Sequence, residues 1–343
     1  MVSRNLKFRF TLVSYNILSQ TLLNEHRYLY SNCNPVDLEW PRRGNRIVTE
    51  LIQNRADIIC LQEVESEHLR SLYRPRLARY GYECLFKKKT GYKIDGCAIF
   101  YKSRLFHLLS YKGIEFKRTD VINILDRDNI GIIAVLKPKI YTRNESPQLV
   151  IANTHLIFNP KRTDIKLAQL KLFLSEIEAI SLKGSNDNHS NDRSYHPTIL
   201  CGDMNSTPES VVNNFVTHNS TNDAEIQPGP NLNRDEISSS DPIADGSSDS
   251  CQNLVHDTLH NDLNSFTHSM RFKSVYPTKD RRGHRYVSTF SSCIVDYIFY
   301  TPCLNLESYR NLLTEDELNE IGPLPNQEFP SDHISLEAKF SVS

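Results

Sequence analysis

Carboxylate, amide and imidazole side chains stand where several apolar runs of this sequence end. In TILCGDMNSTP, residues 198–208, a strand-like run leads directly into Asp203 and Asn205. The other clusters are Tyr15-Asn16, Gln62-Glu63, Asn153-Thr154-His155 and Ser331-Asp332-His333, the last of which precedes an apolar run. Asp296 interrupts the apolar run CIVDYIFY, and a carboxylate in such a position needs a partner.

Hard oxygen ligands without thiolates are typical of sites for Mg²⁺, with Mn²⁺ as a substitute. Such a cation polarises a phosphoryl oxygen and stabilises the leaving oxygen. A carboxylate can orient and deprotonate water, and His or Asn can donate to the charged oxygens of the transition state. Asp203 and Asn205 suit these two roles, since alternate residues beyond a strand end can point into one cavity. Alone, each cluster is more often a turn or a solvated loop, so the hypothesis of phosphoester hydrolysis depends on all of them together.

The elements that must position these side chains alternate between strands and helices. Two segments have helical spacing of apolar residues, 44–55 and 164–182. Strand-like runs rich in β-branched and aromatic residues occupy 8–15, 57–64, 96–102, 130–136, 149–156, 198–203, 293–300 and 334–340. This pattern predicts a mixed α/β fold, in which loops at the carboxyl ends of strands meet at one rim.

Composition is that of an ordinary soluble domain. The 343 residues carry 40 Lys and Arg against 41 Asp and Glu, a net charge of −1, so only a local patch could attract a nucleic acid. No apolar run suits a secretory signal or a membrane span, and scattered cysteines favour an intracellular, cytoplasmic or nuclear location. We expect a single domain over 1–343, with flexible polar insertions at about 184–196 and 219–265.

The motifs SYNIL, LQEVE, NTHL, GDMNS, VDYIFY and SDHISL, in this order, resemble the endonuclease/exonuclease/phosphatase superfamily. That resemblance implies the DNase I-like fold, a four-layer αββα sandwich of two mixed, largely antiparallel sheets packed face to face. It implies Glu63 as the principal Mg²⁺ ligand, with Asn16 and Asp332 near the metal. It implies further that Asp203 activates water, that Asn205 donates to the oxyanion, and that His155 and His333 contact the phosphate. Asp296 would hold His333 in its working tautomer.

VDYIFY is similar to the CCR4-related branch, and SYNILSQTLL, TGYKIDGCAIFYK, ILDRDNIG and NTHLIFNPKRTDIKLAQL resemble the Angel proteins. The resemblance implies a phosphatase that removes a 2′,3′-cyclic phosphate from RNA 3′ ends. A 3′–5′ poly(A) exonuclease is the alternative, and an inactive RNA- or protein-binding scaffold is another. Related deadenylases commonly carry an aromatic residue where this chain has Ser291, which weakens the poly(A) alternative. Pro160, which matches the other half of that adenine clamp, is present.

Basic residues offer contacts for the RNA backbone. Arg127, in LDRDN, suits the geometry of a terminal phosphate, although it could equally pair with Asp126 or Asp128. Three basic stretches lie in predicted loops near the motifs: Lys87-Lys88-Lys89, Lys161-Arg162 and Lys279-Asp280-Arg281-Arg282. Each of these is as consistent with solvated surface charge as with RNA binding.

Overall fold

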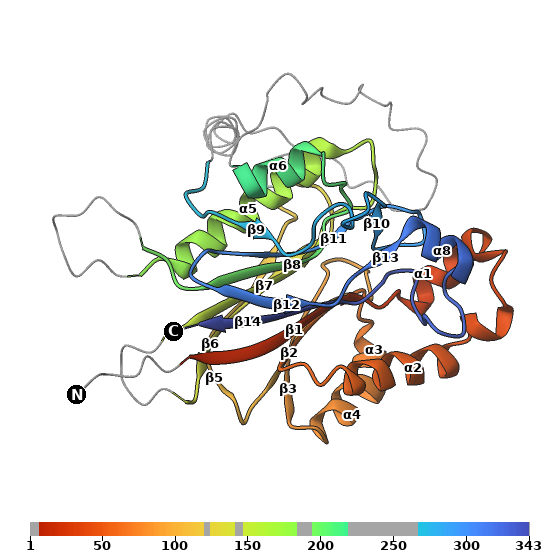
Figure 1. The fold of residues 1–343 in the computed structure, drawn as a ribbon, viewed down its shortest axis with the longest axis horizontal. Helices are drawn as coiled ribbons and strands as arrows, with labels where there is room; N and C mark the ends of the chain where they lie inside the picture. The colour runs from red at the N-terminus through yellow and green to blue at the C-terminus, as the bar shows by residue number, and fades with distance from the viewer. Residues whose placement is uncertain (1–6, 120–123, 141–146, 184–193, 219–266, 343) are drawn as a thin grey trace, which may run out of the picture.

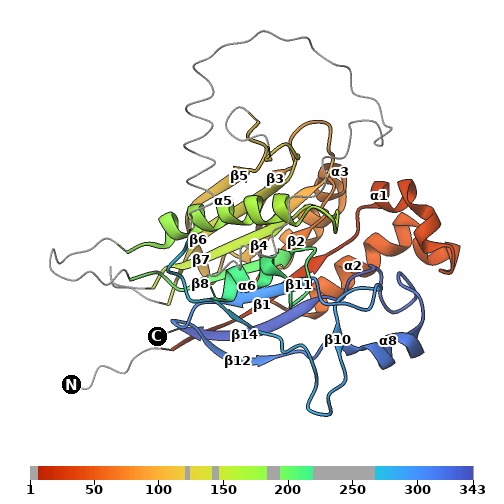
Figure 2. The same cartoon turned by 90° about the horizontal axis from the view of Figure 1, so that it is seen from above.

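The fold is known from a computed structural model, which describes residues 7–119, 124–140, 147–183, 194–218 and 267–342. Two six-stranded sheets form its centre (Figures 1 and 2). The first has the order β12 (Asn305–Tyr309), β14 (Leu336–Val342), β1 (Phe8–Asn16), β2 (Ile58–Gln62), β4 (Gly96–Lys102), β3 (Tyr82–Lys88). The second has the order β5 (Phe106–Glu115), β6 (Ile130–Pro138), β7 (Leu149–His155), β8 (Thr198–Asp203), β11 (Asp296–Tyr300), β9 (Lys273–Ser274).

Helices cover the outer face of each sheet. Figure 1 shows α5 (Thr163–Ser181) and α6 (Val211–His218) on one side of the molecule. On the opposite side lie α2 (Trp40–Gln53), α3 (Ser66–His68) and α4 (Arg74–Ala78), with a π-helical turn at Leu69–Tyr73. The remaining elements are α1 (Gln20–Glu25), 3-10 turns at Arg27–Tyr30 and Pro35–Leu38, the β10 (Tyr286–Val287) and β13 (Leu313–Thr314) pair, and α8 (Glu315–Ile321). The predicted αββα sandwich is therefore confirmed.

The core lies mainly between the two sheets. β2 packs on β7 and β8, and β4 packs on β6 and β7, so these central strands are buried on both faces and read as continuous apolar runs. Gln62 and Asn153 join the sheets through this core, because Gln62 Nε2 donates to Asn153 Oδ1 at 2.7 Å. These two amides of the predicted polar clusters therefore hold the sheets together.

Strand directions explain why all the clusters reach one rim. β1 runs parallel to β2, and β7 runs parallel to β8, so their carboxyl ends lie together. β11 is antiparallel to β8 with Asp296 opposite Asp203, and β14 is antiparallel to β1. The first residues of β11, and those preceding β14, therefore meet the last residues of β8 and β1. Asp296 begins its strand and does not interrupt it.

Two predictions about segments need revision, and a third stays untested. The predicted strand 293–300 is wrong before Asp296, because residues 293–295 are not extended in the sheet and β11 begins only at Asp296. Part of the predicted insertion at 184–196 is ordered by pairing: Lys183 N donates to Ser194 O at 2.9 Å, and His196 N to Ser181 O at 2.7 Å. The insertion predicted at 219–265 lies outside the described residues. Within those residues, no helix combines the length and apolarity needed to cross a membrane.

Candidate active site

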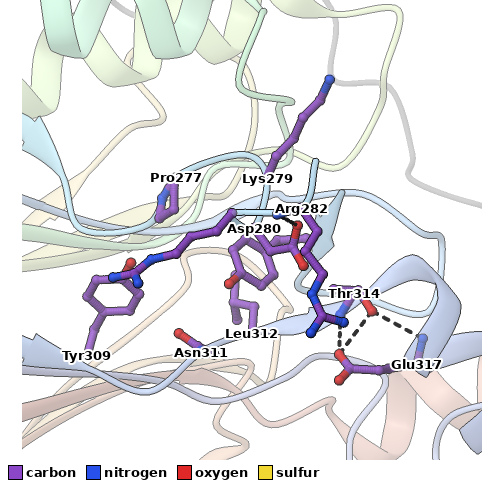
Figure 3. A pocket seen from close by; sticks show the side chains of 11 residues that line it. Pro277, Lys279, Asp280, Arg282, Tyr309, Asn311, Leu312, Thr314 and Glu317 are labelled. Atoms are coloured by element: carbon purple, nitrogen blue, oxygen red, sulfur yellow. Dashed lines mark hydrogen bonds between the residues drawn. The ribbon is translucent and has the colours of Figure 1, made fainter. Parts of the chain in front are cut away.

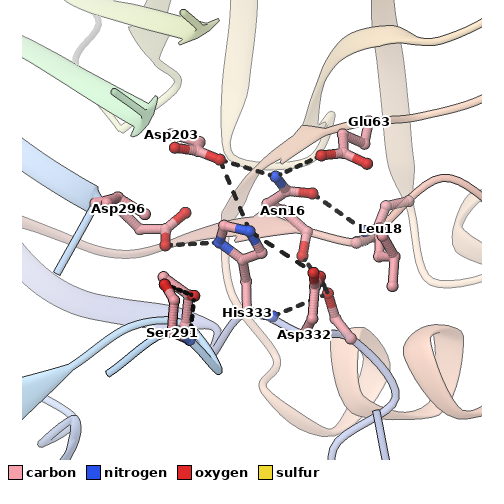
Figure 4. A network of polar contacts seen from close by, with 12 residues as sticks. Asn16, Leu18, Glu63, Asp203, Ser291, Asp296, Asp332 and His333 are labelled. Carbon is pink, nitrogen blue, oxygen red and sulfur yellow. Dashed lines mark hydrogen bonds and ion pairs between the residues drawn. The ribbon is translucent and has the colours of Figure 1, made fainter. Parts of the chain in front are cut away.

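Asn16 links the two sheets at the rim (Figure 4). Its Nδ2 donates to Glu63 Oε1 at 2.9 Å and to Asp203 Oδ2 at 3.0 Å. Leu18 N donates to Asn16 Oδ1 at 3.1 Å, which orients the amide. The side chain is fully buried. The ends of β1, β2 and β8 thus bring an amide and two carboxylates into direct contact.

Glu63 follows β2 in a left-handed conformation with φ of 57°, which is strained for a non-glycine residue. That backbone turns its carboxylate toward Asn16, while Ser19 N donates to Glu63 Oε2 at 2.9 Å. Burial, and then the charges of Asp332 and Asp95, raise the pKa of Glu63. Lys89, which pairs with Asp95 at 2.7 Å, acts in the opposite direction on the pKa of Glu63.

Asp203, Asn205 and His155 form a second connected group. Asp203 Oδ1 accepts a hydrogen bond from Asn205 N at 2.8 Å, and Asn205 is left-handed with φ of 47°. Asn205 Nδ2 lies 3.0 Å from His155 Nε2 and 3.0 Å from Leu156 O. Burial, and then the charge of Asp296, raise the pKa of Asp203 to about 7. Burial, with Lys89 and His333, lowers the pKa of His155 well below its ordinary value.

Asp296 holds His333, as the resemblance implied. Asp296 Oδ2 lies 2.8 Å from His333 Nδ1 and accepts a hydrogen bond from Ser288 Oγ at 2.7 Å. His333 Nε2 faces Asp203 Oδ2 at 3.8 Å (Figure 4). Burial disfavours the imidazolium, but Asp296 and Asp332 outweigh burial and raise the pKa of His333 well above its ordinary value. The surroundings of the two site histidines therefore differ: they favour the neutral imidazole at His155 and the imidazolium at His333.

Asp332 joins the site from the segment before β14. Tyr30 donates its hydroxyl proton to Asp332 Oδ2 at 2.9 Å. Ser331 Oγ donates to the main-chain oxygen of Asn16 at 2.7 Å, which ties this segment to the end of β1. Asp332 Oδ1 is 4.0 Å from His333 Nε2. Its carboxylate thus contributes negative charge to both Glu63 and His333.

The donor set fits a divalent cation. Glu63, Asp203, Asp296 and Asp332 are all buried at the rim, and mutual repulsion contributes to the raised pKa values of Glu63 and Asp203. Such an excess of buried negative charge favours a bound cation. One ligand atom each from Asp203, Asp296 and His333 lie within 4.8 Å of one another. Because Asp296 already bonds His333 and Ser288, we interpret that trio as a proton network, and Glu63 and Asn16 as the stronger candidates for the metal.

Two predicted residues are not joined to this network. Arg127 Nε lies 3.3 Å from Asp126 Oδ1, so the observed partner is its neighbour in sequence. Pro160 is exposed in the loop between β7 and α5. Among the described residues, no hydrogen bond or ion pair links either of them to the network at the strand ends. A role in binding substrate stays a prediction for both.

Lys166 and Ser288 are site residues that sequence reasoning missed. Lys166 lies in the second turn of α5 with only 3% of its surface exposed, and its ammonium donates to the main-chain oxygen of Asn205. A buried lysine near a helix N-terminus is unfavourable both for desolvation and for the helix dipole. Lys166 stands four residues before Leu170 and so lies on the apolar face of the predicted helix. A lysine on that face indicates a buried ammonium with a specific partner. For Ser288 the sequence offered no such signal, because its contact with Asp296 crosses a turn.

The rim geometry and the fold together define a class of metal-dependent phosphoesterase. Residues 13–333 match the model of the Endonuclease/Exonuclease/phosphatase family, and the chain belongs to this family. The structure of ANGEL2, described as a 2′,3′-cyclic phosphatase, in complex with adenosine-2′,3′-vanadate is similar, with a TM-score of 0.81 and 35% identity. The match covers 98% of this chain and 96% of that one.

Curated relatives agree with that likeness. Protein angel homolog 2 of Mus musculus is 36% identical over 388 residues, which is 98% of this chain and 70% of the relative. Carbon catabolite repressor protein 4 homolog 5 of Arabidopsis thaliana is 31% identical, over 97% of this chain and 77% of the relative. The predicted resemblance to the CCR4-related branch and the Angel proteins is thereby confirmed.

Proposed function

We propose that this chain is a Mg²⁺-dependent phosphoesterase that hydrolyses the 2′,3′-cyclic phosphate at RNA 3′ ends. The observation that carries the proposal is the meeting of Asn16, Glu63, His155, Asp203, Asn205, Asp296 and His333 at one rim. Their arrangement stands on a fold shared, at 35% identity, with a structure described as a 2′,3′-cyclic phosphatase bound to adenosine-2′,3′-vanadate. A complete set of polar side chains also argues against an inactive scaffold.

The side chains divide the reaction between them. Asp203, whose pKa of about 7 suits a general base at neutral pH, orients and deprotonates a water molecule that attacks phosphorus. A bond from phosphorus to one ribose oxygen breaks, and that oxygen takes up a proton. Asn205 Nδ2, once it exchanges its contact with His155 Nε2 for the phosphate, stabilises the negative phosphoryl oxygens together with the imidazole of His333. Glu63 and Asn16 would hold the cation, which would supply Lewis-acid stabilisation of the same charge.

Asp296 acts by holding His333, and His155 contacts Asn205 through one ring nitrogen while the other stays open. His155 Nδ1 is buried without a hydrogen-bond partner among the described residues and lies 4.0 Å from Glu63 Oε1. That nitrogen is available for a substrate oxygen. Opening the ring leaves a phosphomonoester, and complete removal of phosphate requires a second attack on the same phosphorus. The same groups serve both steps.

Two RNAs test the proposal. One ends in a 2′,3′-cyclic phosphate, and the other carries a poly(A) tail with free hydroxyls. Each RNA is incubated, with Mg²⁺ or with Mn²⁺, with one of three proteins: the wild type, Glu63→Ala or Asp203→Asn. We expect end repair without shortening by the wild type, and its loss in both variants. Shortening of the poly(A) RNA would replace the proposal with a deadenylase. Binding without turnover of either RNA would support a scaffold, and full activity of Glu63→Ala would refute the metal assignment.

A further inference from the structure

A polar cavity of about 400 Å³ lies beside the β10 and β13 pair, outside the network at the strand ends (Figure 3). It is lined on one side by the turn that holds Lys279, Arg281 and Arg282, and on the other by Tyr309 and Glu317. The mouth is therefore mainly basic, and aromatic rings stand in its wall. Neither feature is used by the proposed reaction.

The turn is rigidly organised by its own residues. Asp280 Oδ1 accepts hydrogen bonds from Arg282 N at 2.8 Å and from His284 N at 2.9 Å. Gly283 has φ of 92°, the left-handed conformation that glycine tolerates. Lys279 bridges Arg285 in antiparallel register, and Tyr286 N donates to Thr278 O at 3.0 Å. A formed turn of this kind presents its basic side chains without a large ordering cost on binding.

The basic side chains at this turn outnumber the acidic ones and are not held in ion pairs within the described part of the chain. Lys279, Arg281 and Arg282 are exposed, and none forms an ion pair with any residue that the structure describes. The nearby acids are occupied elsewhere: Asp280 closes the turn, and Glu317 Oε2 accepts from Thr314 N at 2.7 Å and Thr314 Oγ1 at 3.0 Å in the capping box of α8. Three cations on one turn, without ion pairs to described residues, favour a polyanion as ligand.

The cavity is connected to the active site through the chain. Its lining residue Tyr286 stands three residues before Thr289, which pairs with His333 in an isolated bridge. Extended chain rises about 3.3 Å per residue, so the Cα atoms of Tyr286 and Thr289 are at most about 10 Å apart. Ser288, between them, bonds Asp296. A strand of RNA with its 3′ end at His333 could therefore reach this cavity with nucleotides a short way upstream.

We propose that this cavity is a subsite for the RNA strand upstream of its 3′ end, with Lys279, Arg281 and Arg282 contacting phosphates and Tyr309 offering a stacking surface. The inference rests on the proposed function for the identity of its ligand. Phosphate contacts from exposed cations carry no base specificity. The subsite would accordingly favour long RNA over a mononucleotide, whatever the sequence of the RNA.

Substrate length and salt test the subsite. The triple variant Lys279→Ala/Arg281→Ala/Arg282→Ala is compared with the wild type on adenosine 2′,3′-cyclic phosphate and on a twenty-nucleotide RNA with the same terminus. Three lost contacts to a single strand should flatten the plot of log affinity against log salt by about 2. We expect KM for the RNA to rise at least about tenfold at low salt, with kcat and the kinetics on the mononucleotide within about twofold of the wild type.

Arg74→Ala/Arg76→Ala/Arg79→Ala is the matched control, since it removes three charges around α4 in the outer helical layer. An unchanged KM and salt slope in the pocket variant would overturn the inference, and so would equal losses on both substrates or an equal effect in the control. RNA affinity, measured by fluorescence anisotropy with the same RNA, separates this inference from the proposed function. If the wild type cleaves neither substrate, the proposed function fails, while a selective loss of RNA affinity in the pocket variant still supports the subsite.

Discussion

Replacing Lys166 with Met tests whether this buried lysine positions Asn205, the proposed donor to the oxyanion. The ammonium of Lys166 donates to the main-chain oxygen of Asn205, and Asn205 is held left-handed at φ of 47°. A hydrogen bond from a charged group contributes about 1.5–3 kcal/mol, and each 1.36 kcal/mol corresponds to about tenfold in rate. If the full contact energy serves to position Asn205 in the transition state, kcat should fall by about 13- to 160-fold.

KM should change little, because the ammonium of Lys166 is engaged with the main-chain oxygen of Asn205 and is expected to act through that residue. Stability should not fall correspondingly, since burial already lowers the pKa of Lys166 and Met removes that desolvation cost while retaining the apolar stem. Hydrolysis of adenosine 2′,3′-cyclic phosphate gives kcat and KM, and urea denaturation gives the free energy of unfolding. A loss of kcat accompanied by an equal loss of folded protein would point to simple destabilisation.

A double-mutant cycle provides the decisive comparison. In an Asn205→Ala background, Lys166→Met should have almost no further effect on kcat, because the group that it positions is already gone. Lys171→Met is the matched control: this lysine is also buried on α5, but its ammonium lies 5.4 Å from the ring of Phe215, on α6. A kcat for Lys166→Met within twofold of the wild type, or equal losses in both backgrounds, would refute the reasoning.

Three further predictions concern the rim. Glu63→Gln keeps the shape but removes a charge, so Mg²⁺ affinity, measured by isothermal titration, should fall about 10- to 100-fold, and unchanged affinity would contradict the ligand assignment. Mg²⁺ affinity should also fall as pH drops from 8 to 6, because burial and Asp296 raise the pKa of Asp203 to about 7, and protonation removes its negative charge beside the cation. Titrations that are flat with pH would exclude this. Gly202 has φ of 137°, and a Cβ there would collide with Thr154 O across the β7–β8 pair. Gly202→Ala should therefore lower the free energy of unfolding, measured in urea, by at least about 2 kcal/mol. The matched control is Gly283→Ala, in an open turn, whose effect should be smaller.

Local sequence determined the buried central strands and the residue types that carry chemistry. The predicted runs 96–102 and 198–203 coincide with β4 and β8, because buried central strands are continuous apolar segments whose ends are marked by polar residues. The helices predicted at 44–55 and 164–182 correspond to α2 and α5, since helical periodicity is also a local property. Strands with exposed or mixed surfaces, such as β5 and β12, lacked such a signal and were not predicted.

Tertiary structure decided which of these residues meet. Asp296 stands opposite Asp203 only because β11 pairs antiparallel with β8, and strand pairing depends on contacts far apart in the chain. Lys166 reaches Asn205 from a helix on the outer face of a sheet, whereas Arg127 turns to Asp126 beside it. Side-chain type is written in the sequence, but the register and packing that bring one side chain to another are properties of the whole fold. That is why the chemistry was predictable from GDMNS and its companion motifs, and the network that supports it was not.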